Sequence, residues 1–113
     1  MKTIILQLDP KKLSNPDLDI RYTLPDIVIE RSGGRLTDGG YDYAGEGAES
    51  CLLLFLDTED AEGMTPMVID VLKFERVLEN DLSGTPVAIL DGKSFTVVHP
   101  PDFRGMFPRP DGM

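Results

Sequence analysis

Five consecutive apolar residues, Leu52 to Leu56, constrain the fold more than any other segment of this chain. Successive side chains of a strand point to opposite sides of the sheet, so an unbroken apolar run must be covered on both faces. The stretch from Glu49 to Asp57 therefore predicts a strand in the interior of a sheet. A chain of 113 residues has room for one hydrophobic core, so we expect a single domain built around this sheet.

Further segments have the composition of strands. Thr3 to Leu8 is a short apolar and β-branched run that ends at Asp-Pro, and Pro25 to Arg31 contains Ile-Val-Ile. In the second of these, Ile27 and Ile29 would face one way and Val28 the other. The glycine-rich residues from 39 to 47 predict an irregular, exposed edge hairpin or loop.

The clearest local unit is a hairpin near the C-terminal end of the chain. Two alternating apolar segments, 85–90 and 93–99, flank Asp91-Gly92, which favours a tight two-residue turn. That turn predicts Ala88 opposite Phe95. Residues 100–113 contain four prolines and two glycines, and we expect them to form an extended or disordered tail.

Two segments predict helices. Residues 11–24 favour a short helix with Ser14 or Asn15 as the cap and Pro16 in the first turn, although a loop with one turn fits as well. The second begins either at Thr58 or at Pro66. It predicts an amphipathic helix whose buried side contains Met67, Val71, Phe74 and Leu78.

Together these elements predict an α+β fold. We expect a two-layer sandwich, ferredoxin-like or related, with a mostly antiparallel sheet of five or six strands and one or two helices on one face. The predicted domain spans residues 1–99, and the tail spans residues 100–113.

The charge of the chain is concentrated in one third of its length. Between Leu36 and Leu72 there are nine acids and no Lys or Arg, whereas the other residues carry 11 acids and 11 bases. The formal net charge of −9 therefore arises from this acidic segment. A surface of this kind attracts basic partners and repels nucleic acids and anionic membranes.

Cysteine usage and the N-terminal residues indicate a reducing cytoplasm. Cys51 is the only cysteine and precedes the apolar run, so we expect a buried, structural thiol. Gln7 and Asp9-Pro10 interrupt the first apolar run, which favours a strand over a signal peptide. No segment approaches the roughly 18 apolar residues of a membrane span.

Residue types needed for catalysis or metal binding are sparse. His99 is the only histidine, which leaves a hydrolytic triad without a good base, and no His/Cys cluster has zinc spacing. The acidic run from Asp57 fails the calcium-loop pattern, because Ala61 and Val68 stand where ligands are required. We therefore expect no cofactor, no metal and no catalytic residue. A looser carboxylate site for a divalent metal, or for acid–base chemistry at Asp57 and Asp60, stays open.

Two groups of residues are the predicted partner-binding site. Tyrosine is enriched at the centres of interfaces, and the Gly-rich segment has two tyrosines with one acid, Asp42, between them. A second acidic group follows the interior strand, where helix-start acids on a solvated face are the simpler interpretation. The candidates are Tyr41, Asp42, Tyr43, Glu46, Asp57, Glu59, Asp60 and Glu62.

The stretch from Tyr41 to Leu90 resembles small acidic immunity proteins of bacterial toxin systems. The resemblance lies in the Tyr-Asp-Tyr group, the apolar run from Cys51, the acidic turn at 58–62, and the segments 68–72 and 77–82. Such proteins are made in the cytoplasm and bind a cognate toxin domain, often a basic nuclease. The resemblance implies inhibition by blocking, with no catalytic residue to carry over.

The sequence thus favours a non-catalytic cytoplasmic protein that neutralises a basic protein partner, with no nucleic-acid or membrane partner. One alternative is an accessory or regulatory module of an enzyme or complex, for which a homodimer through a sheet edge is one arrangement. A lesser alternative is a small carboxylate-based metal-binding protein or enzyme.

Overall fold

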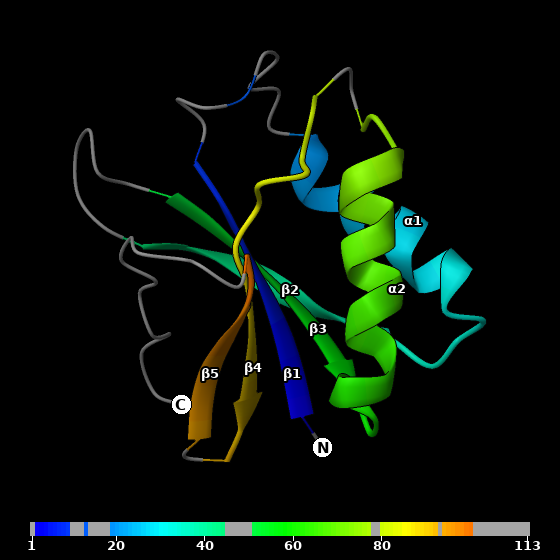
Figure 1. The fold of residues 1–113 in the computed structure, drawn as a ribbon, viewed down its shortest axis with the longest axis vertical. Coiled ribbons are helices and arrows are strands. Elements are labelled where there is room, and N and C mark those ends of the chain that lie inside the picture. The colour runs from blue at the N-terminus through cyan, green and yellow to red at the C-terminus, as the bar shows by residue number, and fades with distance from the viewer. Residues whose placement is uncertain are drawn as a thin grey trace.

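The computed structural model describes residues 2–9, 13, 19–44, 51–77, 80–92 and 94–100. Five strands and two helices follow one another along these residues (Figure 1). Their bounds are β1 Lys2–Leu8, α1 Ile20–Arg31, β2 Thr37–Ala44, β3 Cys51–Thr58, α2 Ala61–Phe74, β4 Val87–Asp91 and β5 Ser94–His99.

The strands form one antiparallel sheet in the order β2-β3-β1-β4-β5. Because β3 lies between β1 and β2, the elements from β1 to β4 have the split βαβ arrangement of ferredoxin-like folds, and β5 adds a fifth strand. Both helices lie on one side of the sheet (Figure 1). The predicted α+β fold with a helical layer and a mostly antiparallel sheet is confirmed.

The main core fills the space between the sheet and the helices. Alternate residues of β1 and β3 point into it, among them Leu6 and Leu54, and both of these side chains are fully buried. Leu54 pairs with Leu6 on one side and with Tyr41 on the other. A smaller cluster lies on the opposite face and contains Ile5, Cys51, Leu53, Phe55 and Leu90. The interior strand is therefore buried on both faces, as predicted, and Cys51 is a buried thiol.

The helices do not cover the whole sheet. α1 makes its sheet contacts with β2 and β3, and α2 makes its contacts with β1 and β3. Arg31 near the end of α1 forms an ion pair with Glu75, which follows α2. The pair of strands β4 and β5 extends beyond this helical layer (Figure 1).

One predicted strand is wrong. The segment Pro25–Arg31 forms the second half of α1 instead of a strand. Ile20, Leu24 and Val28 recur at every fourth position and are all buried, so the helix gains a packed face. This burial outweighs the strand preference of Ile-Val-Ile and the loss of one hydrogen bond at Pro25. Of the predicted helix at 11–24, residues 11, 12 and 14–18 lie outside the described residues.

The second helix differs from its prediction in two ways. α2 runs without a break from Ala61 to Phe74, with Pro66 inside it. Its buried side contains Met64, Val68, Val71 and Leu72, whereas Phe74 is 79% exposed. The predicted buried face is therefore turned about the helix axis relative to the observed one. The prediction counted the helical repeat from Met67, which placed Phe74 in the core. The prediction for Leu78 lies outside the described residues.

The hairpin forms with a different register. Asp91 pairs with Ser94, and Ala88 pairs with Val97 instead of Phe95. In the turn, Gly92 adopts a φ of +59°, which favours glycine. The shift is two residues, so each side chain stays on the face of the hairpin that the predicted pairing gives it.

The irregular edge is confirmed as β2, an edge strand with a register shift between Asp38 and Tyr41. The predicted C-terminal tail lies outside the described residues, apart from Pro100. No helix among the described residues is long and apolar enough to cross a membrane.

Candidate partner-binding surface

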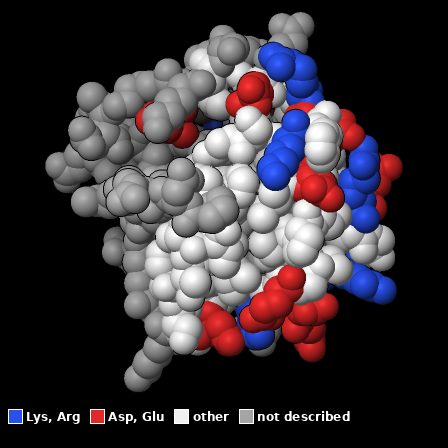
Figure 2. Space-filling model, in the orientation of Figure 1, with Lys and Arg blue, Asp and Glu red and all other residues white. Residues whose placement is uncertain are grey.

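Five carboxylates gather at one end of the sheet. They come from the end of β3, the start of α2 and the end of β4, and we call this group the acidic end: Asp57, Glu59, Asp60, Glu62 and Asp91. Because β1 pairs with both β3 and β4, its first residues lie between the β3 and β4 carboxylates. In Figure 2 acidic side chains group along the lower edge of the molecule, at the start of α2 and the end of β4.

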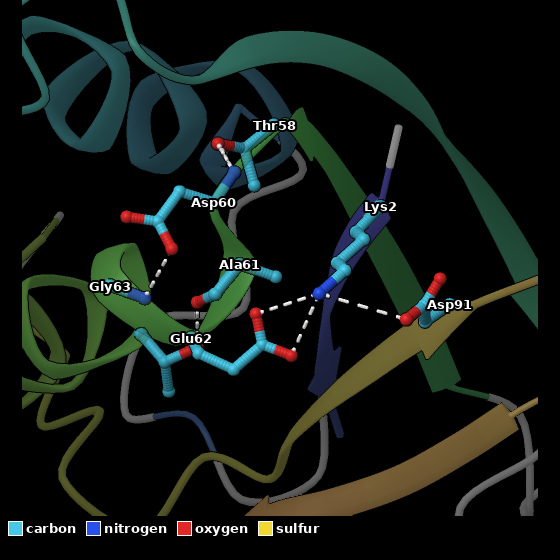
Figure 3. Close-up of polar contacts among 8 residues, drawn as sticks. Lys2, Thr58, Asp60, Ala61, Glu62, Gly63 and Asp91 are labelled. Carbon is cyan, nitrogen blue, oxygen red and sulfur yellow. Dashed lines mark hydrogen bonds and ion pairs between the residues drawn. The ribbon is translucent and has the colours of Figure 1, made fainter.

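Two members of the acidic end support the local structure. Asp60 is the N-cap of α2, and its Oδ1 accepts a hydrogen bond from the Gly63 backbone N–H at 3.0 Å (Figure 3). The Asp60 backbone N–H in turn donates to the Thr58 hydroxyl at 3.1 Å. Asp57 accepts a hydrogen bond from the Thr3 hydroxyl at 2.9 Å. Asp60 therefore holds the start of α2 in place, and Asp57 joins the end of β3 to β1.

Removing the cap should destabilise the protein without changing its fold. We expect Asp60→Ala to lower the free energy of unfolding by about 1 kcal/mol, because the Gly63 N–H loses its acceptor at the helix start. Asp60→Asn should retain most of the stability, since its side-chain oxygen can still accept. Urea denaturation followed by circular dichroism measures both. Equal losses for Ala and Asn would show that the cap is not the source of the effect.

Glu62 and Asp91 share a cation. The Lys2 ammonium lies 2.9 Å from the nearer Glu62 carboxylate oxygen and 3.6 Å from an Asp91 oxygen (Figure 3). Hydrogen bonding from Lys2 lowers the pKa of Glu62 below its ordinary 4.5, and the same bond raises the pKa of Lys2. All three groups are exposed enough for water to screen them, so the pair contributes little to stability.

The pH dependence of this pair has a defined sign. Glu62 binds its proton less readily in the folded protein than in the unfolded chain. Its contribution to the free energy of unfolding is therefore present above pH 4.5 and is lost as the pH falls through its lowered pKa. The raised pKa of Lys2 places the opposite loss in alkali, above its ordinary 10.5. Carboxyl NMR titration should give a Glu62 midpoint below its ordinary 4.5 in the wild type and a higher one in Lys2→Met, where only the backbone hydrogen bond still lowers the pKa. An unchanged midpoint in Lys2→Met would contradict the pairing.

Glu59 is the member of the acidic end that is most available to a partner. It lies in the bend after β3 and is exposed. It makes no hydrogen bond or ion pair with any residue that the structure describes. Its charge therefore faces water without a neighbouring cation to offset it.

The predicted tyrosines lie elsewhere. Tyr41 and Tyr43 pair with Leu54 and Leu52, so Tyr43 lies about 17 Å along the strand from the pairing level of Asp57. They form a cluster with Tyr22 of α1, in which neighbouring rings meet edge to face with centroids 5.9–6.1 Å apart. The structure thus divides the predicted site into two separate surfaces.

Arg21 holds the tyrosine cluster together. Its guanidinium lies 4.8 Å from the centre of the Tyr22 ring and 5.3 Å from that of Tyr41, and it donates a hydrogen bond to the Tyr43 hydroxyl at 3.3 Å. Hydrogen bonding from Arg21 lowers the pKa of the Tyr22 phenol. The three rings remain 40–52% exposed. The cluster is therefore a packed aromatic surface with a cation of its own, unsuited to attracting a basic group.

Asp42 has a local function in the edge strand. Its Oδ1 accepts a hydrogen bond from the Tyr43 backbone N–H at 2.8 Å, and Asp38 does the same for Gly40 at 2.7 Å. Carboxylates therefore satisfy two backbone donors on β2, an edge strand of the sheet that the structure describes, which discourages the addition of another strand. Glu46 lies outside the described residues.

The single Cys and His have structural surroundings. The Cys51 sulfur lies 3.6 Å from the Gln7 amide nitrogen, and the His99 Nε2 lies 3.0 Å from the Ser83 carbonyl oxygen. Among the described residues, no group of three or more His, Cys, Asp or Glu side chains is arranged to hold a metal ion.

Asp91 is the member of the acidic end that sequence reasoning missed, because the Asp-Gly pair was assigned to the turn. Its position follows from the pairing of β4 with β1, which places the end of β4 beside Lys2. Comparisons with protein-family models, curated proteins and solved structures give no match for this chain.

Proposed function

We propose that the protein is a non-catalytic binding protein that neutralises a basic protein partner, as an immunity protein blocks a bacterial toxin domain. The observation that carries the proposal is the acidic end. Two separate chain segments, 57–62 and Asp91, contribute to it. Four of its five carboxylates come from residues 36–72, the segment that accounts for the formal net charge of −9.

The proposed mechanism has two steps. Exposed carboxylates such as Glu59 attract the basic partner over a distance of about one Debye length, roughly 8–10 Å at physiological salt. Contacts made after docking then set the dissociation rate and cover the partner's functional site. In the docked complex, basic side chains of the partner compete with Lys2 for Glu62 and Asp91. The protein supplies no catalytic group in this mechanism, and it acts by steric blocking of the partner's functional site.

The buried thiol supports a reducing compartment for this function. Cys51 is buried against the β-sheet and is the only cysteine of the chain. A free thiol of this kind is typical of cytoplasmic proteins. We therefore propose that the protein meets its partner in the cytoplasm.

Affinity capture from the host lysate tests the proposal. The tagged protein would be used at low and moderate salt, with bound proteins identified by mass spectrometry. The informative variant combines Glu59→Lys with Asp91→Lys, which spares the Asp60 cap. Its matched control combines Asp26→Lys with Glu30→Lys, because these two exposed acids lie on α1 and the change in net charge is the same.

We expect one stoichiometric basic protein bound to the wild type and to the α1 control, and its loss from the Glu59/Asp91 variant. Purified protein should then inhibit the activity of that partner at a one-to-one ratio. Capture of no specific protein at either salt, or binding without inhibition, would contradict the proposed function.

A further inference from the structure

A groove runs between α2 and the strands β4 and β5. Its volume is about 430 Å³, within the range of pockets that hold a ligand or a few side chains. Pro66 and Ile69 of α2 form one wall, and Ile89 of β4 with Val98 of β5 forms the other. In Figure 2 the surface between α2 and β5 carries few charged side chains. The groove is therefore an apolar surface that the fold leaves open to solvent.

Acidic side chains border the apolar floor. Glu62 and Asp70, both on α2, also line the groove. They are eight residues apart, which corresponds to about 12 Å, or slightly more than two turns, along the helix. Glu62 belongs to the acidic end, so the groove is continuous with that surface. Asp70 is exposed and makes no ion pair or hydrogen bond with any described residue.

We infer that this groove binds an amphipathic helix of the basic partner. A helix lying alongside α2 would place basic residues two turns apart opposite Glu62 and Asp70. Apolar residues on the same face, between the two basic ones, would then enter the groove against Ile69, Ile89 and Val98. This inference rests on the proposed function, and it specifies the chemistry of the segment that the partner presents.

A helix fits the groove better than an added strand does. An added strand would pair with the backbone groups of an edge strand, β2 or β5, and would leave the side chains that line the groove uncontacted. The groove instead offers side-chain contacts on the helix-covered side of the sheet. The spacing of its acids, Glu62 and Asp70, follows from the rise per residue of α2. A second helix has the same rise per residue, so its basic side chains can match that spacing.

Synthetic peptides test the inference directly. The first probe is an Ala-based helical peptide with two Lys residues two turns apart and Leu residues between them on the same face. The second replaces each Leu by Ser and keeps the charge. Binding is measured by fluorescence anisotropy, and the contact site is mapped by backbone amide NMR. The variants are Ile69→Gln and Asp70→Lys, and the control is Phe74→Gln, at an exposed position of the same helix.

We expect the Leu peptide to bind at least tenfold more tightly than the Ser peptide and to shift the amides around Ile69 and Val98. Ile69→Gln and Asp70→Lys should each weaken it about tenfold, and Phe74→Gln should leave it unchanged. Because Ile69 is partly buried, Asp70→Lys tests the site even where Ile69→Gln loses stability.

Equal affinity for the two peptides would overturn the groove as the binding site. So would a Leu peptide that binds Ile69→Gln and Asp70→Lys as tightly as it binds the wild type. The proposed function would survive that outcome, because capture of a basic partner through the acidic end is measured separately. Failure of the capture experiment together with tight Leu-peptide binding would instead remove the neutralising function and leave a helix-binding groove.

Discussion

Reversing two charges of the acidic end, with Glu59→Lys and Asp91→Lys, should slow association with the basic partner by about ten- to a hundredfold at low salt. Charge complementarity acts mainly on the association rate, because it raises the frequency of productive encounters. Neither side chain caps a helix or fills the core, so the domain should remain folded. Surface plasmon resonance at low and high salt measures both rate constants.

The salt dependence separates steering from a local defect. At about 1 M salt the Debye length falls to roughly 3 Å, so the wild type and the variant should associate at similar rates. The α1 control, Asp26→Lys with Glu30→Lys, has the same net charge and should associate several-fold faster than the Glu59/Asp91 variant at low salt. Equal association rates for the two variants would show that the net charge of the protein, and not the position of the acidic end, determines the association rate.

The largest loss of stability should come from Leu54. Its side chain is fully buried on the helix-facing side of β3 and packs in the main core. Leu54→Ala should lower the free energy of unfolding by about 3–5 kcal/mol, from lost apolar burial and the cavity that remains. That is a large fraction of the stability of a small domain.

Phe74→Ala is the matched control for this substitution. It removes a larger apolar side chain, but one that is 79% exposed, and should change the free energy of unfolding by about 0.5 kcal/mol or less. Urea denaturation at constant pH compares the two. A loss in the free energy of unfolding below about 1 kcal/mol for Leu54→Ala would contradict the described core. A loss for Phe74→Ala as large as that for Leu54→Ala would contradict it too.

Some elements could be predicted from the sequence because local pattern and burial agree. The interior strand followed from the run at Leu52–Leu56, which only burial on both faces accommodates. The segment Pro25–Arg31 could not be predicted in this way, since its β-branched residues favour a strand. The pattern that decides the structure there is Ile20, Leu24 and Val28, whose spacing of four residues is helical and continues past Pro25, where the sequence predicted the start of a strand.

The candidate site was predicted in part for a similar reason. Asp57, Glu59, Asp60 and Glu62 are neighbours in sequence, so their proximity in space needed only a tight connection between strand and helix. Asp91 joins them through strand pairing. The tyrosines are separated from them because β2 runs antiparallel to β3 and Tyr43 lies at the far end of that pair. Such relations depend on topology, which composition and charge do not determine.

Mapping the partner on the surface by backbone amide NMR tests the central claim most directly. The captured partner would be titrated into isotopically labelled protein, and perturbed amides would be assigned to the described elements. We predict shifts centred on residues 57–62, Lys2 and Asp91, extending along α2 toward Asp70. Shifts confined to the cluster of Arg21, Tyr22, Tyr41 and Tyr43, with none at the acidic end, would contradict the claim.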